Sequence, residues 1–314
     1  MAKKILILGA TGGIGSAVAR VALQRGWQVV ALARDREKAA REWKGPLAPE
    51  WLCGDAMVRE DVVRAASGVS AIFHAVNPPG YRGWERLVLP MIDNTIAAAR
   101  AHGGPQIVLP GTIYNYDPRS SPVIDEATPQ HPIGRKGAIR VELERRLANA
   151  APEVPSLVVR AGDFFGPGAR QSWFAQALAK PPLTRVVYPG RPGVGHAWAY
   201  LPDLGEALIR LIEIGRERLR PAERMQFGGF WDPDGREMIA AIRRAVGRPD
   251  LPVRSFPWWL LRLLAPFGGF PREVMEVRPF WQSPVRLDNR RLVGLLGKEP
   301  ATSLDEAVAA SLAA

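Results

Sequence analysis

The sequence predicts an α/β protein: a doubly wound parallel sheet with a smaller lobe formed by the C-terminal part of the chain. Two observations support this fold class. Short apolar runs alternate with helical patterns through the first third of the sequence, and the first run, Ile5–Leu8, leads directly into a glycine-rich segment. Short apolar runs that end at glycine are typical of strands buried on both faces, and strands separated by helices pair in parallel.

The elements follow one another in strict alternation up to residue 109. Strands are expected at residues 5–8, 28–33, 51–53, 71–75 and 106–109. Helices are expected between them at residues 16–25, 37–42, 59–67 and 87–102. After residue 165 the pattern loosens, because prolines cluster between residues 181 and 192, and two further helices are expected at 201–214 and 234–246.

Composition excludes several classes of function. The chain carries a net charge of +11, but its basic residues are scattered, so we expect a solvated positive surface and no nucleic-acid partner. Cys53 is the only cysteine, which excludes an internal disulfide and a cysteine metal cluster, and the four histidines show no metal-ligand spacing. The N-terminal apolar run is too short for a signal peptide, and the run at 256–270 is too short and interrupted to span a bilayer. We therefore expect a cytoplasmic protein without a membrane span.

The glycine-rich segment joins the first predicted strand to the first predicted helix, with the spacing Gly-x-x-Gly-x-x-Gly. Glycines at these places permit a tight turn, a close approach of backbone to a diphosphate and close packing of the helix on the strand. The free N–H groups at the helix start then favour the negative charge of a diphosphate. The sequence thus predicts a Rossmann-type dinucleotide site whose contacts are Gly9, Thr11, Gly12, Gly13, Ile14 and Gly15.

This glycine spacing resembles that of the extended and atypical branches of the short-chain dehydrogenase/reductase superfamily, whose known members include epimerases and dehydratases. The resemblance covers most of the chain and continues at residues 54–55, 73–75, 160–168 and 196–203. It implies that Asp55 lies beside the adenine, although Asp55 would equally serve as an N-cap of the next helix. It also implies that Ala75 and Asn77 contact the cofactor, with the loop 77–81 over the nicotinamide, and that residues 160–168 and 196–203 border the substrate cleft.

The choice between NAD and NADP depends on the end of the second strand. Arg34 lies there, 19 residues after Gly15, where an acidic residue would bind the ribose hydroxyls of NAD. A guanidinium instead suits the 2′-phosphate of NADP, and Arg36 could assist. The adjacent Asp35 favours NAD. Arg34 could also be a surface charge without a role in cofactor binding. We expect NADP, with NAD as the less favoured cofactor.

The catalytic residues depart from the superfamily pattern, which implies a Ser or Thr after strand five and a Tyr-x-x-x-Lys on the next helix. Thr112 matches the hydroxyl position, but Ile133 and Gly137 stand where the tyrosine and the lysine belong. Tyr114 is a candidate replacement for the proton donor, because on a strand its side chain would share a face with Thr112. Tyr116 and Tyr200 are alternative phenols.

Two further segments leave alternatives open. Lys136 could reach the nicotinamide ribose, or it could be a solvated lysine at the start of a helix. The aromatic stretch 256–264 has helical apolar spacing, which favours packing within the small lobe; a substrate-pocket wall or a membrane-surface contact are the other readings.

Together these observations predict a Rossmann domain at residues 1–165, to which the chain returns around 195–230, and a mostly substrate-binding lobe at 166–314. The expected function is an NADP(H)-dependent oxidoreductase acting on a small organic carbonyl or alcohol, as a monomer or homodimer and without a metal. A nucleotide-sugar-type epimerase or dehydratase, and a non-catalytic NADP(H) sensor that binds a protein partner, are the alternatives.

Overall fold

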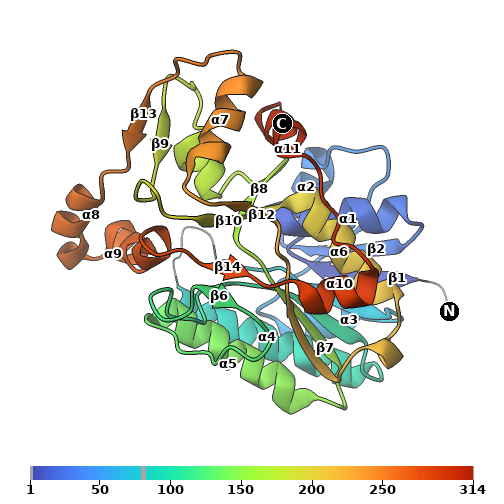
Figure 1. Cartoon of the computed structure of the whole chain (residues 1–314). Helices are drawn as coiled ribbons and strands as arrows, with labels where there is room; N and C mark the ends of the chain where they lie inside the picture. The colour runs from blue at the N-terminus through green and yellow to red at the C-terminus, as the bar shows by residue number, and fades with distance from the viewer. Residues whose placement is uncertain (1–2, 79–82, 314) are drawn as a thin grey trace.

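A computed structural model of the chain describes residues 3–78 and 83–313. Its main sheet has seven strands in the order β11–β7–β5–β4–β1–β2–β3, and every pair is parallel (Figure 1). The order reverses between β1 and β4, so ligands are expected at the carboxyl ends of these two strands. The strands are β1 Lys4–Leu8, β2 Gln28–Ala33, β3 Glu50–Cys53, β4 Ala71–His74, β5 Gln106–Gly111, β7 Ser156–Arg160 and β11 Ala222–Gln226.

Helices cover both faces of this sheet, which confirms the doubly wound fold. Ile5 and Ile7 of β1 belong to the core under α1 and α6, whereas Leu6 and Leu8 belong to the core under α3, α4 and α5. Successive residues point to opposite faces of a strand, so a fully apolar strand is needed here. The helices of these layers are α1 Gly13–Gln24, α2 Arg36–Glu42, α3 Arg59–Ala65, α4 Trp84–Ala101, α5 Arg135–Ala150, α6 Leu201–Glu213 and α10 Arg290–Leu296.

The chain leaves the main sheet after β7 and builds a second layered region around a core that contains Phe165, Trp198 and Trp281. A three-stranded sheet, β12–β10–β8, lies at its centre, and β13 pairs with β9 beside it. Its strands are β8 Asp163–Phe165, β9 Val186–Tyr188, β10 His196–Tyr200, β12 Phe230–Asp232 and β13 Val253–Ser255. Its helices are α7 Arg236–Ala245, α8 Trp258–Leu264, α9 Gly269–Met275 and α11 Leu304–Leu312.

Short elements complete the chain and connect the two regions. The strands β6 Val123–Ile124 and β14 Arg286–Leu287 form a two-stranded pair that joins the loop after β5 to the C-terminal part (Figure 1). The remaining short helices are η2 Phe174–Leu178, η3 Arg216–Arg218, η4 Ala265–Phe267 and η5 Arg278–Trp281. Residues 201–226 return to the main sheet, where α6 packs on α1 and β11 extends the edge beside β7.

The alternation predicted before residue 109 is confirmed within a few residues, with differences at the helix starts. The first helix begins at Gly13 rather than residue 16, and α4 begins at Trp84 rather than residue 87. The first turn of α1 is mostly glycine and that of α4 contains Glu85 and Arg86, so the apolar spacing becomes recognisable only about one turn after each helix begins. No helix in the described residues is long and apolar enough to cross a membrane.

Candidate functional site

The turn between β1 and α1 requires glycine at two positions. Gly9 has φ of +94°, and a Cβ there would lie 2.7 Å from the carbonyl oxygen of Ala75. A Cβ at Gly15 would lie 2.1 Å from the carbonyl oxygen of Gly9, because α1 packs directly on the turn. Gly12 closes the turn by donating its N–H to that same oxygen at 3.0 Å.

The start of α1 is open to an anion. Its N-cap is Gly12, no side chain of the described residues caps it, and its first turn contains no acid. The amides of Gly13, Ile14 and Gly15 therefore lie at the positive end of the helix without an intrahelical acceptor. Ser16 donates its hydroxyl to the carbonyl oxygen of Gly13 at 2.9 Å, which orders the first turn. These are the residues in which the sequence predicted a diphosphate site, and the geometry fits that group.

The end of β2 separates two neighbouring charges. Arg34 is exposed, and its side chain has no hydrogen bond or ion pair with any described residue. Asp35 is the N-cap of α2, and its Oδ1 accepts the N–H of Lys38 at 2.9 Å. The carboxylate that would favour NAD is therefore engaged in capping a helix, while the guanidinium beside it faces solvent.

Asp55 follows β3 and is half-buried. Its Oδ1 accepts the N–H of Met57 at 2.9 Å, and its own N–H donates to Asp61 at 2.9 Å. The N-cap of α3 is Val58, so the reading of Asp55 as the cap of that helix is wrong. Its place beside the adenine stays a prediction.

The predicted cofactor contacts Ala75 and Asn77 follow the carboxyl end of β4. Ala75 extends the strand by donating its N–H to the carbonyl oxygen of Leu8 at 2.9 Å. Asn77 accepts from the guanidinium of Arg140 at 3.0 Å. Residues 79–81, which were expected to continue the loop over the nicotinamide, lie outside the described residues.

Thr112 and Tyr114 do not share a strand face as predicted. β5 ends at Gly111, and the chain turns at once, with the N–H of Tyr116 donating to the carbonyl oxygen of Ile113. The turn nevertheless brings the two residues together, because the N–H of Tyr114 donates to Oγ1 of Thr112 at 3.3 Å. The alternative phenol of Tyr116 is buried in the core and is 1% exposed.

Lys136 is buried, which contradicts its reading as a solvated lysine. It is 2% exposed, and its Nζ forms ion pairs with Glu273 and with Glu276, the latter at 3.0 Å. Nζ also donates to the carbonyl oxygen of Glu273 at 3.3 Å. These contacts fasten the start of α5 to the end of α9, so the ammonium is already surrounded by acceptors of the protein.

Comparisons with known proteins agree with this geometry. Residues 9–145 match the family model described as NAD(P)H-binding. The chain is 30% identical over 182 residues to a 3-diazoavenalumate denitrifying reductase from a Streptomyces species, which covers 52% of this chain and 57% of the relative. It is 28% identical over 178 residues to a 2-alkyl-3-oxoalkanoate reductase from Stenotrophomonas maltophilia; the match covers 54% of this chain and 53% of that relative. The chain thus spans little more than half the length of these curated relatives.

A solved structure shares the whole fold. MoeE5 in complex with UDP-glucuronic acid and NAD superposes with a TM-score of 0.76 at 18% identity, covering 99% of this chain and 98% of that one. At this identity the likeness shows a shared fold. Residues 9–145 therefore form an NAD(P)H-binding domain, and the curated relatives named above are reductases.

The structure leaves no room for a side chain at Gly137, where the resemblance places the catalytic lysine. A Cβ at Gly137 would lie 2.1 Å from the carbonyl oxygen of Tyr114 and 2.7 Å from Cβ of Pro132. A lysine cannot occupy this position without moving the turn that carries Tyr114. Ile133, at the usual place of the tyrosine, lines a cavity of about 10 Å³ together with Tyr114 and Phe280.

Arg140 lies one helical turn after Gly137 and was not foreseen from the sequence. Its guanidinium stacks on Trp84 at 4.8 Å from the ring centroid, and its Nε is buried without a partner among the described residues. Burial lowers the pKa of Arg140 to about 10, while the nearby Glu144 and Tyr114 oppose that shift. A spacing of three residues from Gly137 along α5 was the signal that could have found it, since such residues share a helix face.

Two further polar groups lie near the segments expected to border the cleft. His196 of β10 stacks on Trp281 at 3.8 Å, and its Nε2 lies 2.8 Å from Oδ2 of Asp163 at the start of β8. Arg160 at the end of β7 is 2% exposed and forms a buried ion pair with Glu144. Both pairs fix the positions of strand ends around the site.

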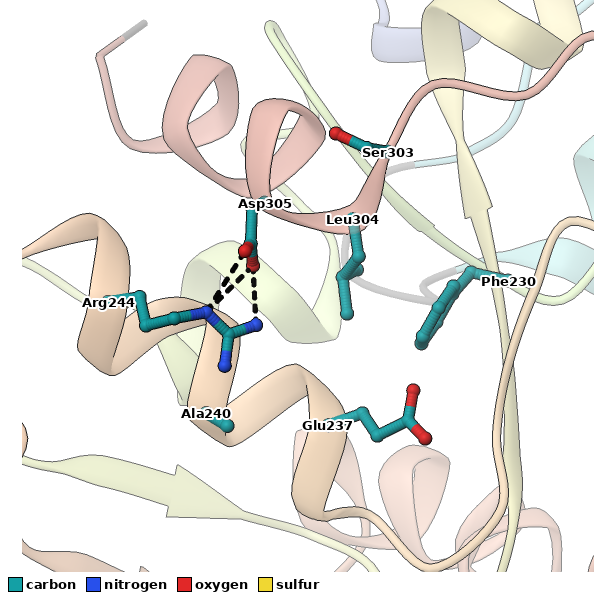
Figure 2. Close-up of a pocket in the computed structure, with 7 residues that line it drawn as sticks. All are labelled: Phe230, Glu237, Ala240, Arg244, Ser303, Leu304 and Asp305. Atoms are coloured by element: carbon teal, nitrogen blue, oxygen red, sulfur yellow. Dashed lines mark hydrogen bonds and ion pairs between the residues drawn. The ribbon is translucent and has the colours of Figure 1, made fainter.

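A second hollow, larger than the cavity beside Ile133, does not coincide with this site. It has a volume of about 410 Å³ and lies between α7 and α11, where Arg244 and Asp305 pair with each other (Figure 2). It receives no residue from the glycine-rich turn or from the ends of the main-sheet strands. No group of three or more metal-ligating side chains occurs in the described part of the chain.

Proposed function

We propose that this chain is an NADP(H)-dependent oxidoreductase that reduces a small organic carbonyl compound. The choice of NADP rests on the different environments of Asp35 and Arg34 at the end of β2. The carboxylate of Asp35 is held by the amide of Lys38, and the neighbouring guanidinium of Arg34 remains exposed. A 2′-phosphate is the part of NADP that a guanidinium binds in a bidentate, charge-assisted manner.

The proposed proton donor is the phenol of Tyr114. Bound NADPH supplies the hydride, and the substrate oxygen then needs a proton. Tyr114 lies close enough to Arg140 for a Tyr114 phenolate to raise the pKa of the Arg140 guanidinium. The same attraction stabilises the phenolate, and so favours loss of the Tyr114 proton. Thr112, whose Oγ1 accepts the N–H of Tyr114, retains its hydroxyl proton for the substrate oxygen.

In this proposal the Arg140 guanidinium supplies the positive charge that the missing lysine would otherwise provide. Its charge is partly desolvated, its Nε has no partner among the residues described, and it reaches Asn77 at the carboxyl end of β4. Ligands of open α/β sheets bind at such strand ends, next to the switch in strand order. A cation there would hold the ribose of the nicotinamide and favour loss of the phenol proton.

The names of the curated relatives support reduction as the reaction class. Both are reductases, and one is named for 2-alkyl-3-oxoalkanoates. We therefore propose 3-oxo acids as the first substrates to try.

Two measurements test the proposal. Calorimetry should show saturable binding of NADPH, and Arg34→Ala should weaken NADPH by about 10- to 100-fold, the value of a charge-assisted contact of about 1.5–3 kcal/mol. Binding of NADH should not change, and Arg41→Ala on α2 is the matched control. Equal losses for both cofactors would contradict the choice of NADP.

Turnover is measured as NADPH consumption with a panel of 3-oxo acids and simple ketones. Tyr114→Phe should lower kcat by at least 100-fold and leave the Kd of NADPH unchanged, since general acid catalysis contributes about that much. Tyr116→Phe, in the core, is the control for loss of a phenol. Unchanged turnover in Tyr114→Phe would remove Tyr114 from the mechanism.

A non-catalytic sensor is the second candidate, because Ile133 and Gly137 replace both usual catalytic residues. It requires different affinities for NADP⁺ and NADPH, since a ligand shifts only states that it distinguishes. No turnover on any substrate together with unequal affinities would favour it. A sugar nucleotide that raises the melting temperature would instead favour the epimerase or dehydratase reading.

A further inference from the structure

The helices α8 and α9, with η4 between them, expose a continuous set of large apolar side chains. We call this set the apolar ridge; its members are Trp259, Leu260, Leu263, Leu264, Phe267 and Phe270. Trp259 is 68% exposed, Leu263 63% and Phe267 88%. The prediction that residues 256–264 pack within the small lobe is therefore wrong for Trp259, Leu260, Leu263 and Leu264. It is confirmed for Phe256 and Trp258, which pack against Trp173.

The ridge is a cluster and not ordinary scatter. The described residues contain twelve exposed large hydrophobic side chains, and six of them fall within residues 259–270. Single exposed apolar residues need no explanation, but a contiguous apolar surface marks a contact with something else. Neither hollow described above is lined by a member of the ridge, so these side chains face outward.

The elements that carry the ridge are fastened on their opposite side. Trp258 donates its indole N–H to the carbonyl oxygen of Pro189 at 2.7 Å, and Arg272 donates to the carbonyl oxygens of Ala265 and Pro266. At the end of α9, Glu273 is held by the buried Lys136. Figure 1 shows α8 and α9 standing out from one side of the molecule. The surface is thus presented by a fixed support.

The charge around the ridge has one sign. Residues 251–272 contain Arg254, Arg262 and Arg272 and no acidic residue, in a chain whose net charge is +11. The acids that flank this segment are Asp250 before it and Glu273 and Glu276 after it, and both glutamates form ion pairs with Lys136. Elements that lie in the interface of an anionic bilayer have this composition: Trp, Phe and Leu on one face, with basic residues beside them.

We propose that the apolar ridge docks this protein onto the surface of an anionic lipid bilayer. The aromatic and leucine side chains enter the headgroup boundary, and Arg254 and Arg262 contact the lipid phosphates. A second copy of the chain is a poorer occupant, because a two-fold interface places each patch against itself and would bring the arginines together without an acid in the segment. The proposal is independent of the reaction assigned to the cleft.

Flotation with lipid vesicles tests the proposal. The full chain is mixed with vesicles of phosphatidylcholine alone, or of phosphatidylcholine with 30% phosphatidylglycerol, and the bound fraction is measured at low and high salt. We expect binding to the anionic vesicles, weakening with salt, and at least tenfold weaker binding for the double variant Leu263→Ser, Phe267→Ser. The variant Leu47→Ser, Val123→Ser removes two exposed apolar residues elsewhere and is the matched control.

Charge and apolar contributions are separated by a second variant. Arg254→Gln, Arg262→Gln should lose about fivefold in affinity per arginine for anionic vesicles, because a basic residue at such a surface contributes about 1 kcal/mol. Melting temperatures of all variants show that they remain folded.

Three results would overturn the proposal. One is that the wild-type chain does not float with anionic vesicles. Another is that the ridge variant floats as well as the wild type. The third is a dimer in sedimentation velocity without lipid that dissociates in the ridge variant, which would assign the ridge to a second copy of the chain.

Discussion

The buried lysine at the start of α5 gives a sharp test of what holds the two regions together. Lys136→Met removes an ammonium that lies between Glu273 and Glu276 and keeps most of the apolar stem. Removal of one partner from a buried ion pair costs about 3–5 kcal/mol, because the remaining charges are left uncompensated. The two carboxylates are about one-fifth exposed, so we expect the lower end, about 3 kcal/mol.

That free energy converts into a measurable shift. The entropy of unfolding is about 2.1 cal/mol/K per residue, or about 0.66 kcal/mol/K for this chain. The melting temperature should fall by about 5 °C in Lys136→Met, measured by calorimetry. Arg100→Met is the matched control, because its ion pair with Glu153 joins two side chains that are 50% and 63% exposed. Such a surface pair contributes at most about 1 kcal/mol.

The same variant decides whether Lys136 serves the cofactor. If its role is to fasten α5 to α9, NADPH should bind Lys136→Met with nearly the wild-type affinity. A tenfold weaker affinity for NADPH at an unchanged melting temperature would refute the reasoning and restore Lys136 as a ligand of the nicotinamide ribose.

Three further outcomes are expected. Burial lowers the pKa of His74 to about 3, so between pH 6.5 and 3 the unfolded chain binds a proton that the folded chain does not. Stability should thus fall by up to about 1.4 kcal/mol per pH unit on acidification, and urea titrations at pH 6 and 5 should show a smaller loss in His74→Gln; equal losses would contradict a neutral buried imidazole. Gly15→Ala should abolish NADPH binding in calorimetry while far-ultraviolet circular dichroism is retained, whereas Gly294→Ala, whose Cβ meets open space, should be silent. Gly137→Ala should lower both the melting temperature and kcat, because its Cβ would lie 2.1 Å from the carbonyl oxygen of Tyr114. A fully active and stable variant would show that the turn carrying Tyr114 can move to accept the added methyl group.

The part of the site that the sequence located well is the part built from backbone. Gly9 and Gly15 are required by the turn itself, and the strand before them and the helix after them are adjacent along the chain. Local spacing therefore predicts both the structure and the diphosphate site. Arg34 is found in the same way, because it ends the next strand.

The positions of the candidate catalytic side chains could not be predicted from local spacing. The prediction placed Thr112 and Tyr114 on a strand face, but β5 ends at Gly111 and a turn sets their positions. Lys136 was judged by its place at a helix start, and its burial depends on Glu273 and Glu276, about 140 residues away along the chain. Side chains that act across such distances are positioned by packing, which periodicity does not encode.

The sequence by itself determined the parallel sheet, the glycine turn and the charge at the end of β2, because each depends on neighbours within about thirty residues. Only the tertiary structure decided that Gly137 excludes a lysine and that Arg140 lies near Tyr114. It also decided that Trp259 and Phe267 face outward. Amphipathic spacing shows that a helix has an apolar face, but only the packed chain shows whether that face is covered.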